Sequence, residues 1–481
     1  MPRELITVQV GQCGNQIGCR FWDIALREHA SVSSSKNPVF DESLSSFFRN
    51  VDRSQRNLPV GSPITSLRAR AVLIDTETGV LNSIQSGPLR ELFDSRQLIS
   101  DQYGAGNNWA QGHMEYGPKY RESIAECVRQ TVEHCDSLQS FFVLHSLGGG
   151  TGSGLGTYVL SLLSDYYPEV YRFTASVFPS EDDDVVTSPY NSALALKKLS
   201  DHADCVLPIE NQALVDIHEK VSQRLEKYKQ SSTSAKVKMG ETGAITSGGT
   251  MGKARSFDEM NNIAANMLTN LTASMRFEGS LNVDLNEITM NMVPFPRLKF
   301  LVSSVSPLCG KLSRGADGSP YSVDAMFSEA FHKDSQLIKG DPKSSTYLAC
   351  ALMARGDVPI SDMHRNVARM KKSVTMARWN PDGFKIGLCG TPPAGQDKAL
   401  LCLSNNCCVA DTFSAFQERF MRLYKRKAML HHYDKFLGSD SQQEFEEAAE
   451  NLKALVKEYQ EYDMSSSQSI PAERMRIKPA I

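Results

Sequence analysis

The sequence predicts an α/β fold in which an open parallel sheet is followed by a smaller α+β domain and a C-terminal pair of helices. Three observations support this prediction. Short apolar runs alternate with helical patterns through the first half of the chain, which is typical of parallel α/β proteins. After Phe257 the pattern changes to a helix followed by strands. The C-terminal part carries two apolar stripes at helical spacing, one including Phe413 and Phe420, the other Phe445 and Tyr459.

The composition is that of a globular protein. Of the 481 residues, 41% are hydrophobic and 22% are charged, which argues against disorder and allows several domains. The net charge of −3 gives the chain as a whole no attraction for nucleic acid. No apolar run approaches the ~18 residues of a membrane span, and the first residues lack a signal-peptide pattern. We therefore expect a soluble protein of the cytoplasm with neither nucleic acid nor membrane as a partner.

The eleven cysteines do not indicate a metal site or a disulfide framework. No Cys-x-x-Cys pair occurs, and the odd total in a chain without a secretion signal predicts reduced, mostly buried thiols. The neighbouring His431 and His432 would point in different directions on a helix. A structural role is the expectation for both groups.

Runs that are apolar almost throughout predict strands buried on both faces of a sheet. In the first half, strands are expected at 5–10, 71–75, 141–145, 173–178 and 203–208, and helices at 15–27 and 153–166. In the second half, strands are expected at 299–303, 385–388 and 400–404. These patterns divide the chain into a first domain (1–218), an insertion (219–256), an intermediate domain (257–393) and a C-terminal strand with helices (394–481).

Two segments interrupt the pattern. Residues 31–66 are rich in serine and contain Pro59 and Pro63, which predicts irregular surface structure. Residues 219–256 have little apolar periodicity and are rich in Ser, Thr and Gly, which predicts a mobile basic insertion. Its charged residues are eight bases, Lys220, Arg224, Lys227, Lys229, Lys236, Lys238, Lys253 and Arg255, against three acids. The insertion is either a binding element for an acidic partner or a solvated loop without one.

The strongest motif is the run Ser-Leu-Gly-Gly-Gly-Thr-Gly-Ser-Gly at 146–154. It follows an expected strand and begins an expected helix, where backbone N–H groups and the helix dipole favour an anion. Glycines let the backbone approach phosphate oxygens, and Ser146 and Thr151 can donate hydroxyl hydrogen bonds. No Gly-Lys-Ser/Thr follows, which excludes a P-loop, and no Gly-x-Gly-x-x-Gly occurs in the run. The remaining alternative is a tight turn without a ligand.

Two more glycine-bearing loops and two acids accompany this run. Residues 11–18 contribute N–H groups and the Gln12 amide, and residues 104–109 form the third loop. Asp75 and Glu77 end an expected strand and could hold Mg²⁺ directly or through water. Several such loops at the carboxyl ends of parallel strands predict a nucleotide site.

These loops resemble those of the tubulin superfamily, and the resemblance covers almost the whole chain. It implies a tubulin-like GTPase fold: a Rossmann-like parallel nucleotide domain, an α+β intermediate domain and a C-terminal helical hairpin, with GTP or GDP and Mg²⁺ as ligands. The residues that the resemblance assigns to the phosphates and sugar are Gln12, Cys13, Asn107, Ser146, Gly149, Gly150, Thr151, Gly152 and Asp184. Tyr190 and Asn191 match the turn beside the sugar.

The resemblance also assigns the base site and the interface. Asn211 and Asn261 would read the guanine while Phe257 stacks on it; the alternative is that both asparagines cap helices or turns. Residues 281–287 and 291–296 match segments that face the next subunit. Glu287 occupies the place of a glutamate in alpha-tubulin where beta-tubulin has lysine. It would act on the neighbouring subunit's GTP, unless it is only an exposed glutamate on a surface helix.

Within the superfamily, residues 47–52, residues 190–192 and the basic insertion are most similar to epsilon-tubulin. This implies a place in the cytoskeleton at the centrosome, centriole and basal body, with delta-tubulin, alpha/beta-tubulin and centriolar accessory proteins as partners. The chain departs from alpha- and beta-tubulin at Ser188, where they have a glutamate near the ribose, at Phe257, where tyrosine is usual, and in lacking an acidic final segment.

The glycine loops and the resemblance allow three functions. The first is a GTP-binding cytoskeletal subunit of triplet microtubules, with hydrolysis completed across a subunit interface. The second is a GTP-bound scaffold or cap that neither polymerises nor hydrolyses. The third is a dehydrogenase that uses the glycine loops for NAD, and the missing Gly-x-Gly-x-x-Gly run argues against it.

Overall fold

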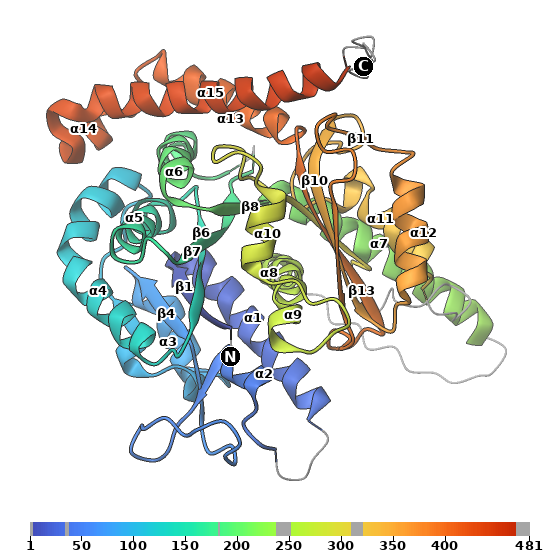
Figure 1. The fold of residues 1–481 in the computed structure, drawn as a ribbon. Helices are drawn as coiled ribbons and strands as arrows, with labels where there is room; N and C mark the ends of the chain where they lie inside the picture. The colour runs from blue at the N-terminus through green and yellow to red at the C-terminus, as the bar shows by residue number, and fades with distance from the viewer. Residues whose placement is uncertain (1–2, 34–37, 181–182, 237–251, 309–320, 468–481) are drawn as a thin grey trace, which may run out of the picture.

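The computed structural model describes residues 3–33, 38–180, 183–236, 252–308 and 321–467. Figure 1 shows two sheets side by side, each with helices packed against it, and a pair of long helices that crosses both at the top. The first sheet and its helices come from the N-terminal half of the chain. No helix in the described ranges is both long and apolar enough to cross a membrane.

The first sheet has six parallel strands in the order β5-β4-β1-β6-β7-β8. Side chains of successive residues in β1 face opposite cores: Ile6, Val8 and Val10 enter one apolar cluster and Leu5 enters the other. All five predicted strands are confirmed, with ends shifted by up to three residues. The short β5 was not predicted. The strands are β1 (Glu4–Val10), β4 (Ala71–Asp75), β5 (Leu98–Ser100), β6 (Leu138–Ser146), β7 (Tyr171–Phe178) and β8 (Cys205–Glu210).

Helices cover both faces of this sheet (Figure 1). They are α1 (Gly11–Val32), α3 (Thr78–Ser86), α4 (Gly117–Glu133), α5 (Gly156–Tyr166), α6 (Ser188–His202), α7 (Asn211–Lys236) and α8 (Gly252–Leu271). Two π-helical turns, η3 (Gln111–Tyr116) and η4 (Thr151–Leu155), precede α4 and α5. The loops that contain Gln12, Asn107 and the glycine-rich run follow the carboxyl ends of β1, β5 and β6, and Asp75 and Glu77 lie at the carboxyl end of β4.

The prediction of irregular surface structure at 31–66 is wrong in part. A short helix α2 (Glu42–Ser45) leads into β2 (Phe48–Asn50), which pairs with β3 (Leu67–Ala69). Phe47 and Phe48 are buried and pack edge-on against Trp22. The serine-rich composition suggested a solvated loop, but Ser46 is buried as well, with its hydroxyl donating to a backbone oxygen.

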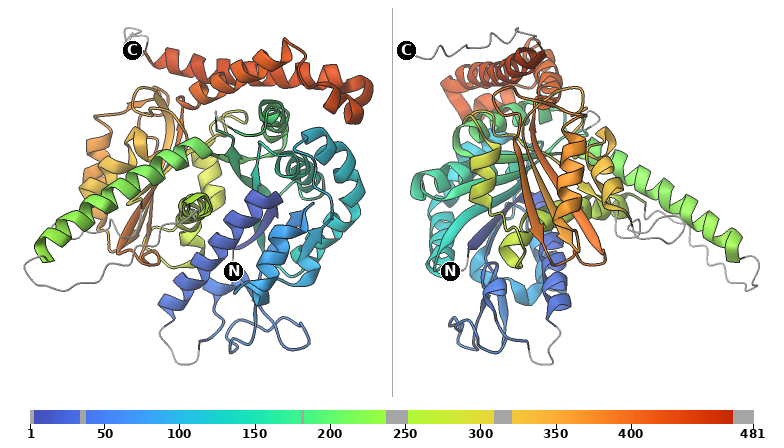
Figure 2. Two further views of the ribbon diagram at one scale, coloured as in Figure 1. Left: turned by 180° about the vertical axis from the view of Figure 1, so that it is seen from behind. Right: turned by 45° about the vertical axis from the view of Figure 1, so that its right-hand side comes forward.

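The prediction of a mobile insertion at 219–256 is also wrong in part. α7 continues to Lys236 and α8 begins at Gly252, and Figure 2 shows α7 projecting beyond the body of the molecule. A helix that projects in this way needs no apolar stripe, so periodicity did not reveal it. Lys220 pairs with Asp334 at 3.0 Å and Arg224 with Glu329 at 2.8 Å. The remaining part of the insertion, 237–251, lies outside the described residues.

The second sheet has five strands, with β10 between β13 on one side and β11 and β12 on the other, and β9 at the far edge of β13. Val206 of β8 bonds to Lys299 and Leu301, which joins the two sheets. A strand was predicted at 299–303, but Lys299 and Leu301 bond to β8 of the first sheet and the strand of the second sheet begins only at Val302. The elements are β9 (Val302–Ser306), β10 (Thr346–Gly356), β11 (Thr375–Met376), β12 (Phe384–Cys389) and β13 (Lys398–Asn406), with α9 (Ala273–Arg276), α10 (Leu285–Met292), α11 (Val323–Ala330) and α12 (Ile360–Met370).

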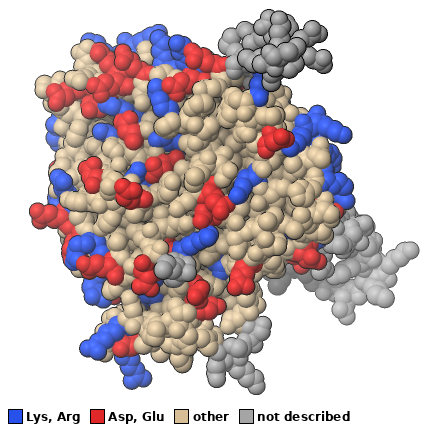
Figure 3. Space-filling model, viewed as in Figure 1, with Lys and Arg blue, Asp and Glu red and all other residues tan. Residues whose placement is uncertain are grey.

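The predicted C-terminal helices are confirmed as α13 (Val409–Tyr424) and α15 (Ser441–Ser467), joined through α14 (His431–Leu437). Phe413, Phe420, Phe445 and Tyr459 are buried in one core. Lys197 of α6 pairs with Glu444 and Glu447 of α15. Acidic and basic side chains lie close together over these helices (Figure 3).

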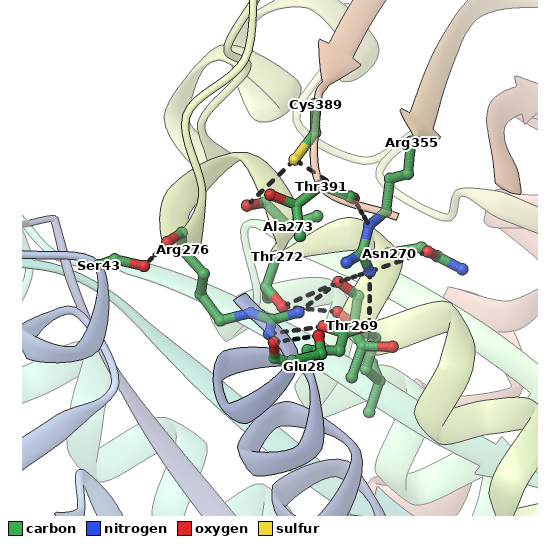
Figure 4. Close-up of polar contacts among 12 residues, drawn as sticks. Glu28, Ser43, Thr269, Asn270, Thr272, Ala273, Arg276, Arg355, Cys389 and Thr391 are labelled. Atoms are coloured by element: carbon green, nitrogen blue, oxygen red, sulfur yellow. Dashed lines mark hydrogen bonds and ion pairs between the residues drawn. The ribbon is translucent and has the colours of Figure 1, made fainter. Parts of the chain in front are cut away.

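A buried charge cluster joins α1 to α9 and to β10 of the second sheet, the part of the chain called the second domain below (Figure 4). Glu28, near the end of α1, pairs with Arg276 at 2.7 Å and with Arg355 at 2.9 Å, and all three side chains are almost fully buried. Both guanidinium groups also donate to the backbone oxygen of Thr269 near the end of α8. Burial opposes the charge on Glu28, but the two arginines outweigh it and lower the pKa of its carboxyl.

Candidate nucleotide-binding site

The glycine-rich loop between β6 and η4 has one glycine that is open and several that are packed. A Cβ at Gly149 would have only the Asn107 Oδ1 at 3.8 Å and the Ser146 Oγ at 4.0 Å nearby. A Cβ at Gly150 would be 2.5 Å from the Ala105 oxygen, and one at Gly152 would be 2.7 Å from the Ser146 Oγ. Gly150 and Gly152 are therefore required by the packing of the loops and have only their N–H groups to offer a ligand.

The first loop packs directly on the glycine-rich loop. Gly11 has a positive φ of 74°, and a Cβ there would be 3.1 Å from the Gly152 nitrogen. Gln12 follows in the first turn of α1 and is exposed. Cys13 is partly buried, and burial raises the pKa of its thiol to about 12, so it is a neutral group. The arrangement leaves Gln12 as the accessible polar side chain of this loop.

Asp75 ends β4 beside these loops and is almost fully buried. Its Oδ1 accepts from the Glu77 N–H, whereas its Oδ2 has no hydrogen-bond partner. Burial raises the pKa of Asp75 to about 6, with the Glu77 charge adding to the effect. The exposed Glu77 carboxylate lies over Gly104. Next to Asp75, the hydroxyl groups of Thr76 and Thr151 are 2.6 Å apart.

These two carboxylates fit Mg²⁺ in the way that nucleotide sites use it. Mg²⁺ prefers oxygen ligands and is usually held by one or two carboxylates together with phosphates and water. The unpartnered Asp75 oxygen supplies such a ligand. No group of three or more His, Cys, Asp or Glu side chains suited to a metal occurs in the described part of the chain. Mg²⁺ at Asp75 and Glu77 would therefore depend on the nucleotide for its other ligands.

The loop at 104–109 is held in an unusual backbone conformation. Gly106 and Asn107 both have φ of 52°. The Asn107 side chain faces Gly149, and its backbone oxygen accepts from the Asn191 Nδ2 at 2.8 Å. Trp109 is fully buried and donates its backbone N–H to the Asn191 Oδ1 at 2.8 Å. This loop is therefore ordered by α6 and not only by its own glycines.

Tyr190 and Asn191, which match the turn beside the sugar, lie in the first turn of α6. Both side chains are fully buried and bonded within the protein, so neither faces a ligand. Asp184 is exposed. Ser188, the residue that departs from alpha- and beta-tubulin, is buried and donates to the Asp183 Oδ2 at 2.8 Å. Among the described residues from 183 onward in this segment, Asp183 and Asp184 have exposed carboxylates.

Three helices surround the predicted base site. Asn211 is the first residue of α7, while Phe257 and Asn261 lie on the first half of α8. An ion pair at 3.3 Å joins Arg20 of α1 to Asp258 of α8, so α8 runs beside the helix that follows the first phosphate loop. Phe257 is 57% exposed, as an aromatic ring that stacks on a ligand would be. Asn261 lies inside α8, where a helix cap is not possible.

Glu287 lies far from these loops. It is in the first turn of α10, where the Asp284 side chain accepts from its N–H at 2.7 Å. Asp284 pairs with Arg3 at 3.1 Å, which places α10 at the amino end of β1, whereas Gly11 follows the carboxyl end. A seven-residue strand spans roughly 20 Å. The half-exposed Glu287 carboxylate pairs with Lys385 of β12 at 2.7 Å.

Sequence reasoning missed the roles of Asn191 and Lys385. Asn191 was noted only as part of a turn, and a buried asparagine has no signal of its own in a sequence. Lys385 was seen as part of a strand, and its approach to Glu287 is set only by the packing of β12 against the loop before α10.

The fold and the glycine loops are those of a tubulin-type GTPase domain, and comparison with known proteins agrees. Residues 4–219 match the Tubulin/FtsZ family GTPase domain, and residues 296–418 match the tubulin C-terminal domain. The chain belongs to the tubulin family of GTP-binding cytoskeletal proteins.

Among its relatives, the chain is similar to the tubulin epsilon chain of Homo sapiens, with 53% identity over 474 residues that cover 97% of this chain and 98% of the relative. The tubulin epsilon chain of Mus musculus is also 53% identical, over 478 residues with the same coverage. The tubulin beta-2 chain of Suillus bovinus is 34% identical over 469 residues, 96% of each chain. The resemblance to tubulins, and to epsilon-tubulin in particular, is confirmed.

Proposed function

We propose that this protein is a GTP-binding subunit that stacks head to tail with other tubulin subunits and that GTP hydrolysis is completed across the interface. The observation that carries the proposal is the position of Glu287. It lies at the amino end of β1, beyond Arg3 and Asp284, whereas the phosphate loops follow the carboxyl end. Glu287 cannot reach the nucleotide of its own chain, but a head-to-tail contact brings it to the nucleotide of the next subunit.

The surface formed by the segment after α10 supports such a contact. Phe295, three residues after α10, stacks on Tyr462 with ring centroids 5.0 Å apart and meets the half-exposed Trp379 edge-on at 5.8 Å. Phe295 and Tyr462 also line a groove of about 510 Å³. Exposed aromatic residues that form a cluster are characteristic of the buried centre of protein interfaces. Tubulin subunits are the partners that the family relationship indicates.

In the proposed reaction, the protein positions the phosphates and a water molecule. N–H groups of the glycine-rich loop, with Ser146, Thr151 and Asn107, would bind the phosphate oxygens. Mg²⁺ held by Asp75 and Glu77 would neutralise phosphate charge. Gln12 and Asp184 would contact the nucleotide from the first loop and the sugar side. Glu287 of the neighbouring subunit would orient the water and accept its proton.

The proposed place of action is the centriole and basal body, as a component of triplet microtubule assembly with delta-tubulin, alpha/beta-tubulin and centriolar accessory proteins. The similarity to tubulin epsilon chains supports this proposal. Tagged protein is expected to concentrate at centrosomes. Uniform distribution of the tagged protein along cytoplasmic microtubules would contradict the proposed place of action.

A second function is favoured by one contact. Because Lys385 pairs with Glu287 within the chain, the carboxylate is occupied before any neighbour arrives. A GTP-bound scaffold or cap that does not hydrolyse GTP would have this arrangement. GTP turnover in the assembled state separates the two functions, as described in the Discussion.

Guanine recognition gives the first test of the proposed function. Purified protein is expected to retain GTP or GDP and not ATP. Replacing Asn261 with Ala is expected to weaken GTP binding about tenfold to a hundredfold, because it removes buried hydrogen bonds to the base worth ~1–3 kcal/mol. Nucleotide content is measured by chromatography of the denatured protein and affinity by titration with a fluorescent GTP analogue.

The control for this test is Asn262→Ala, at the next position of the same helix and equally half-buried. Successive helix positions face different directions, so this variant is expected to bind GTP normally. Equal retention of ATP and GTP by the unmodified protein, or equal loss in the two variants, would contradict the assignment.

Asp75 gives a second test through Mg²⁺ and pH. Because the pKa of Asp75 is raised to about 6, its carboxyl takes up a proton as pH falls below that value. Mg²⁺-dependent retention of GTP is expected to be lost between pH 7 and 5. The stability of the nucleotide-free fold should rise over the same range, because a raised pKa means that the folded state binds the proton more tightly.

Asp75→Asn is expected to remove the Mg²⁺ dependence at pH 7 while leaving the fold at least as stable. Glu115→Gln removes an exposed charge and serves as the control. A Mg²⁺ affinity of Asp75→Asn equal to that of the control would exclude Asp75 as a metal ligand.

A further inference from the structure

The Asn191 amide is a buried junction of the nucleotide loops. Its Nδ2 donates to the backbone oxygens of Asn107 and Gly148, both at 2.8 Å. Its Oδ1 accepts from the Trp109 N–H at 2.8 Å and from the Tyr433 hydroxyl at 2.6 Å. Both hydrogens and both lone pairs of the amide are thus used. One side chain therefore fixes the glycine-rich loop and the 104–109 loop relative to each other.

The fourth bond comes from the C-terminal helices. Tyr433 lies on α14 and is fully buried. The adjacent backbone oxygen of His432 accepts from the Asn108 Nδ2 at 2.9 Å. Two consecutive residues of α14 therefore contact residues that hold the same phosphate-facing loop. These contacts lie on the buried side of helices whose opposite side is the outer surface of the molecule (Figure 1).

We propose that Tyr433 is a positioning residue for the nucleotide, through which the placement of α14 controls the affinity for GTP. The proposal rests on the proposed function, because it assigns a regulation to the same GTP site. When Tyr433 bonds to Asn191, the amide is oriented to hold Asn107 and Gly148, the residues on either side of the open Gly149 position. When α14 shifts, the amide loses this orientation and the two loops separate.

Coupling of this kind acts in both directions. If the placement of α14 changes the affinity for GTP, bound GTP must stabilise α14 by the same factor. A partner that binds over the C-terminal helices would then change nucleotide retention without touching the nucleotide. If the Tyr433–Asn191 hydrogen bond did not control the affinity for GTP, its loss would lower the stability of the fold and leave GTP binding unchanged.

The chain contains a matched control in Tyr190. It is also fully buried, its ring meets that of Tyr433 edge-on at 5.6 Å, and its hydroxyl donates to the Ala428 oxygen at 2.9 Å. It holds the same C-terminal segment to the same domain through one hydroxyl hydrogen bond. Its hydroxyl does not bond to either phosphate-facing loop in the described structure.

The test compares Tyr433→Phe with Tyr190→Phe in the full chain. Each variant loses one short buried hydroxyl bond; the Tyr433 hydroxyl has in addition only a long contact of 3.5 Å to the Thr187 backbone oxygen. Similar decreases in urea stability are therefore expected. Release of a fluorescent GTP analogue, followed by stopped flow, is expected to be about tenfold faster for Tyr433→Phe and within twofold of the unmodified protein for Tyr190→Phe. Hydrogen exchange of unmodified protein should show residues 431–437 protected by GTP.

Equal release rates for the two variants, or exchange of 431–437 that does not respond to GTP, would overturn the inference while leaving the proposed function in place. If the unmodified protein itself failed to bind GTP, the proposed function would be the part that is wrong.

Discussion

Replacing Glu28 with Gln is expected to destabilise the protein by roughly 3–5 kcal/mol, the largest stability effect that the fold predicts. Glu28 is the single acid between Arg276 and Arg355, and none of the three side chains has more than 1% exposure. Glutamine keeps the shape but removes the charge, which leaves two guanidinium groups buried beside each other without compensation. The midpoint of urea denaturation, with an unchanged slope, measures the effect.

The pH dependence of this contribution follows from the direction of the pKa shift. The two arginines lower the pKa of Glu28 below its unfolded value despite burial. Its stabilisation is therefore present above the unfolded pKa of about 4.3 and is lost as pH falls through the lower folded value. Unmodified protein should lose stability in this acid range more steeply than Glu28→Gln.

Asp23→Asn is the matched control, because Asp23 pairs with Arg27 on the exposed side of the same helix. A surface pair of this kind contributes at most about 1 kcal/mol. If the two variants lost the same stability, the buried cluster would not be what joins α1 to the second domain.

The cluster also shows which part of the fold could be predicted from the sequence. The strands at 71–75 and 141–145 were found because both faces are buried, so all residues except the last of each, Asp75 and His145, are apolar. Glu28, Arg276 and Arg355 are charged residues on three separate elements, and in the sequence each has the appearance of a solvent-facing side chain. Their convergence is a property of tertiary packing, which periodicity does not report.

The same contrast applies to the candidate site. Loops rich in glycine, and acids that end a strand, carry a local signal because backbone conformation and strand order place them at one edge of the sheet. That signal identified the loops containing Gly149 and Asn107 and the acid Asp75. It gave no indication that Asn191 is enclosed by four hydrogen bonds or that Lys385 reaches Glu287. These contacts depend on how α14 and β12 pack, and the family resemblance matched Asn191 only to the turn beside the sugar.

Replacing Glu287 with Ala is expected to lower GTP turnover in the assembled state by ~10²–10⁴-fold, the usual contribution of a general base. Binding of GTP to the variant should be unchanged, since Glu287 and the phosphate loops are at opposite ends of β1. Turnover is measured as phosphate release from protein mixed with alpha/beta-tubulin, and affinity with a fluorescent GTP analogue. Glu278→Ala, which removes an exposed glutamate shortly before α10, is the control.

Mixing variants tests the division of the site between subunits. A chain with Glu287→Ala keeps its nucleotide site, and a chain with Asn261→Ala keeps Glu287. If the chain stacks on itself, each variant alone should be slow, and the mixture should recover turnover at the interfaces where an intact Glu287 meets an intact nucleotide site. Recovery requires the two functional groups to come from different molecules, because no single chain in the mixture carries both.

GTP turnover in the assembled state also distinguishes the hydrolysing subunit from the GTP-bound scaffold, because the two differ in whether the ion pair between Lys385 and Glu287 opens. For hydrolysis, the Lys385–Glu287 pair, whose side chains are 32% and 41% exposed, must open when the next subunit's phosphates and water arrive. Lys385 is then free to pair with a phosphate, so opening is favoured by the ligand itself. If assembled, unmodified protein turned over GTP no faster than Glu287→Ala, the pair would remain closed, and the protein would be a GTP-bound scaffold.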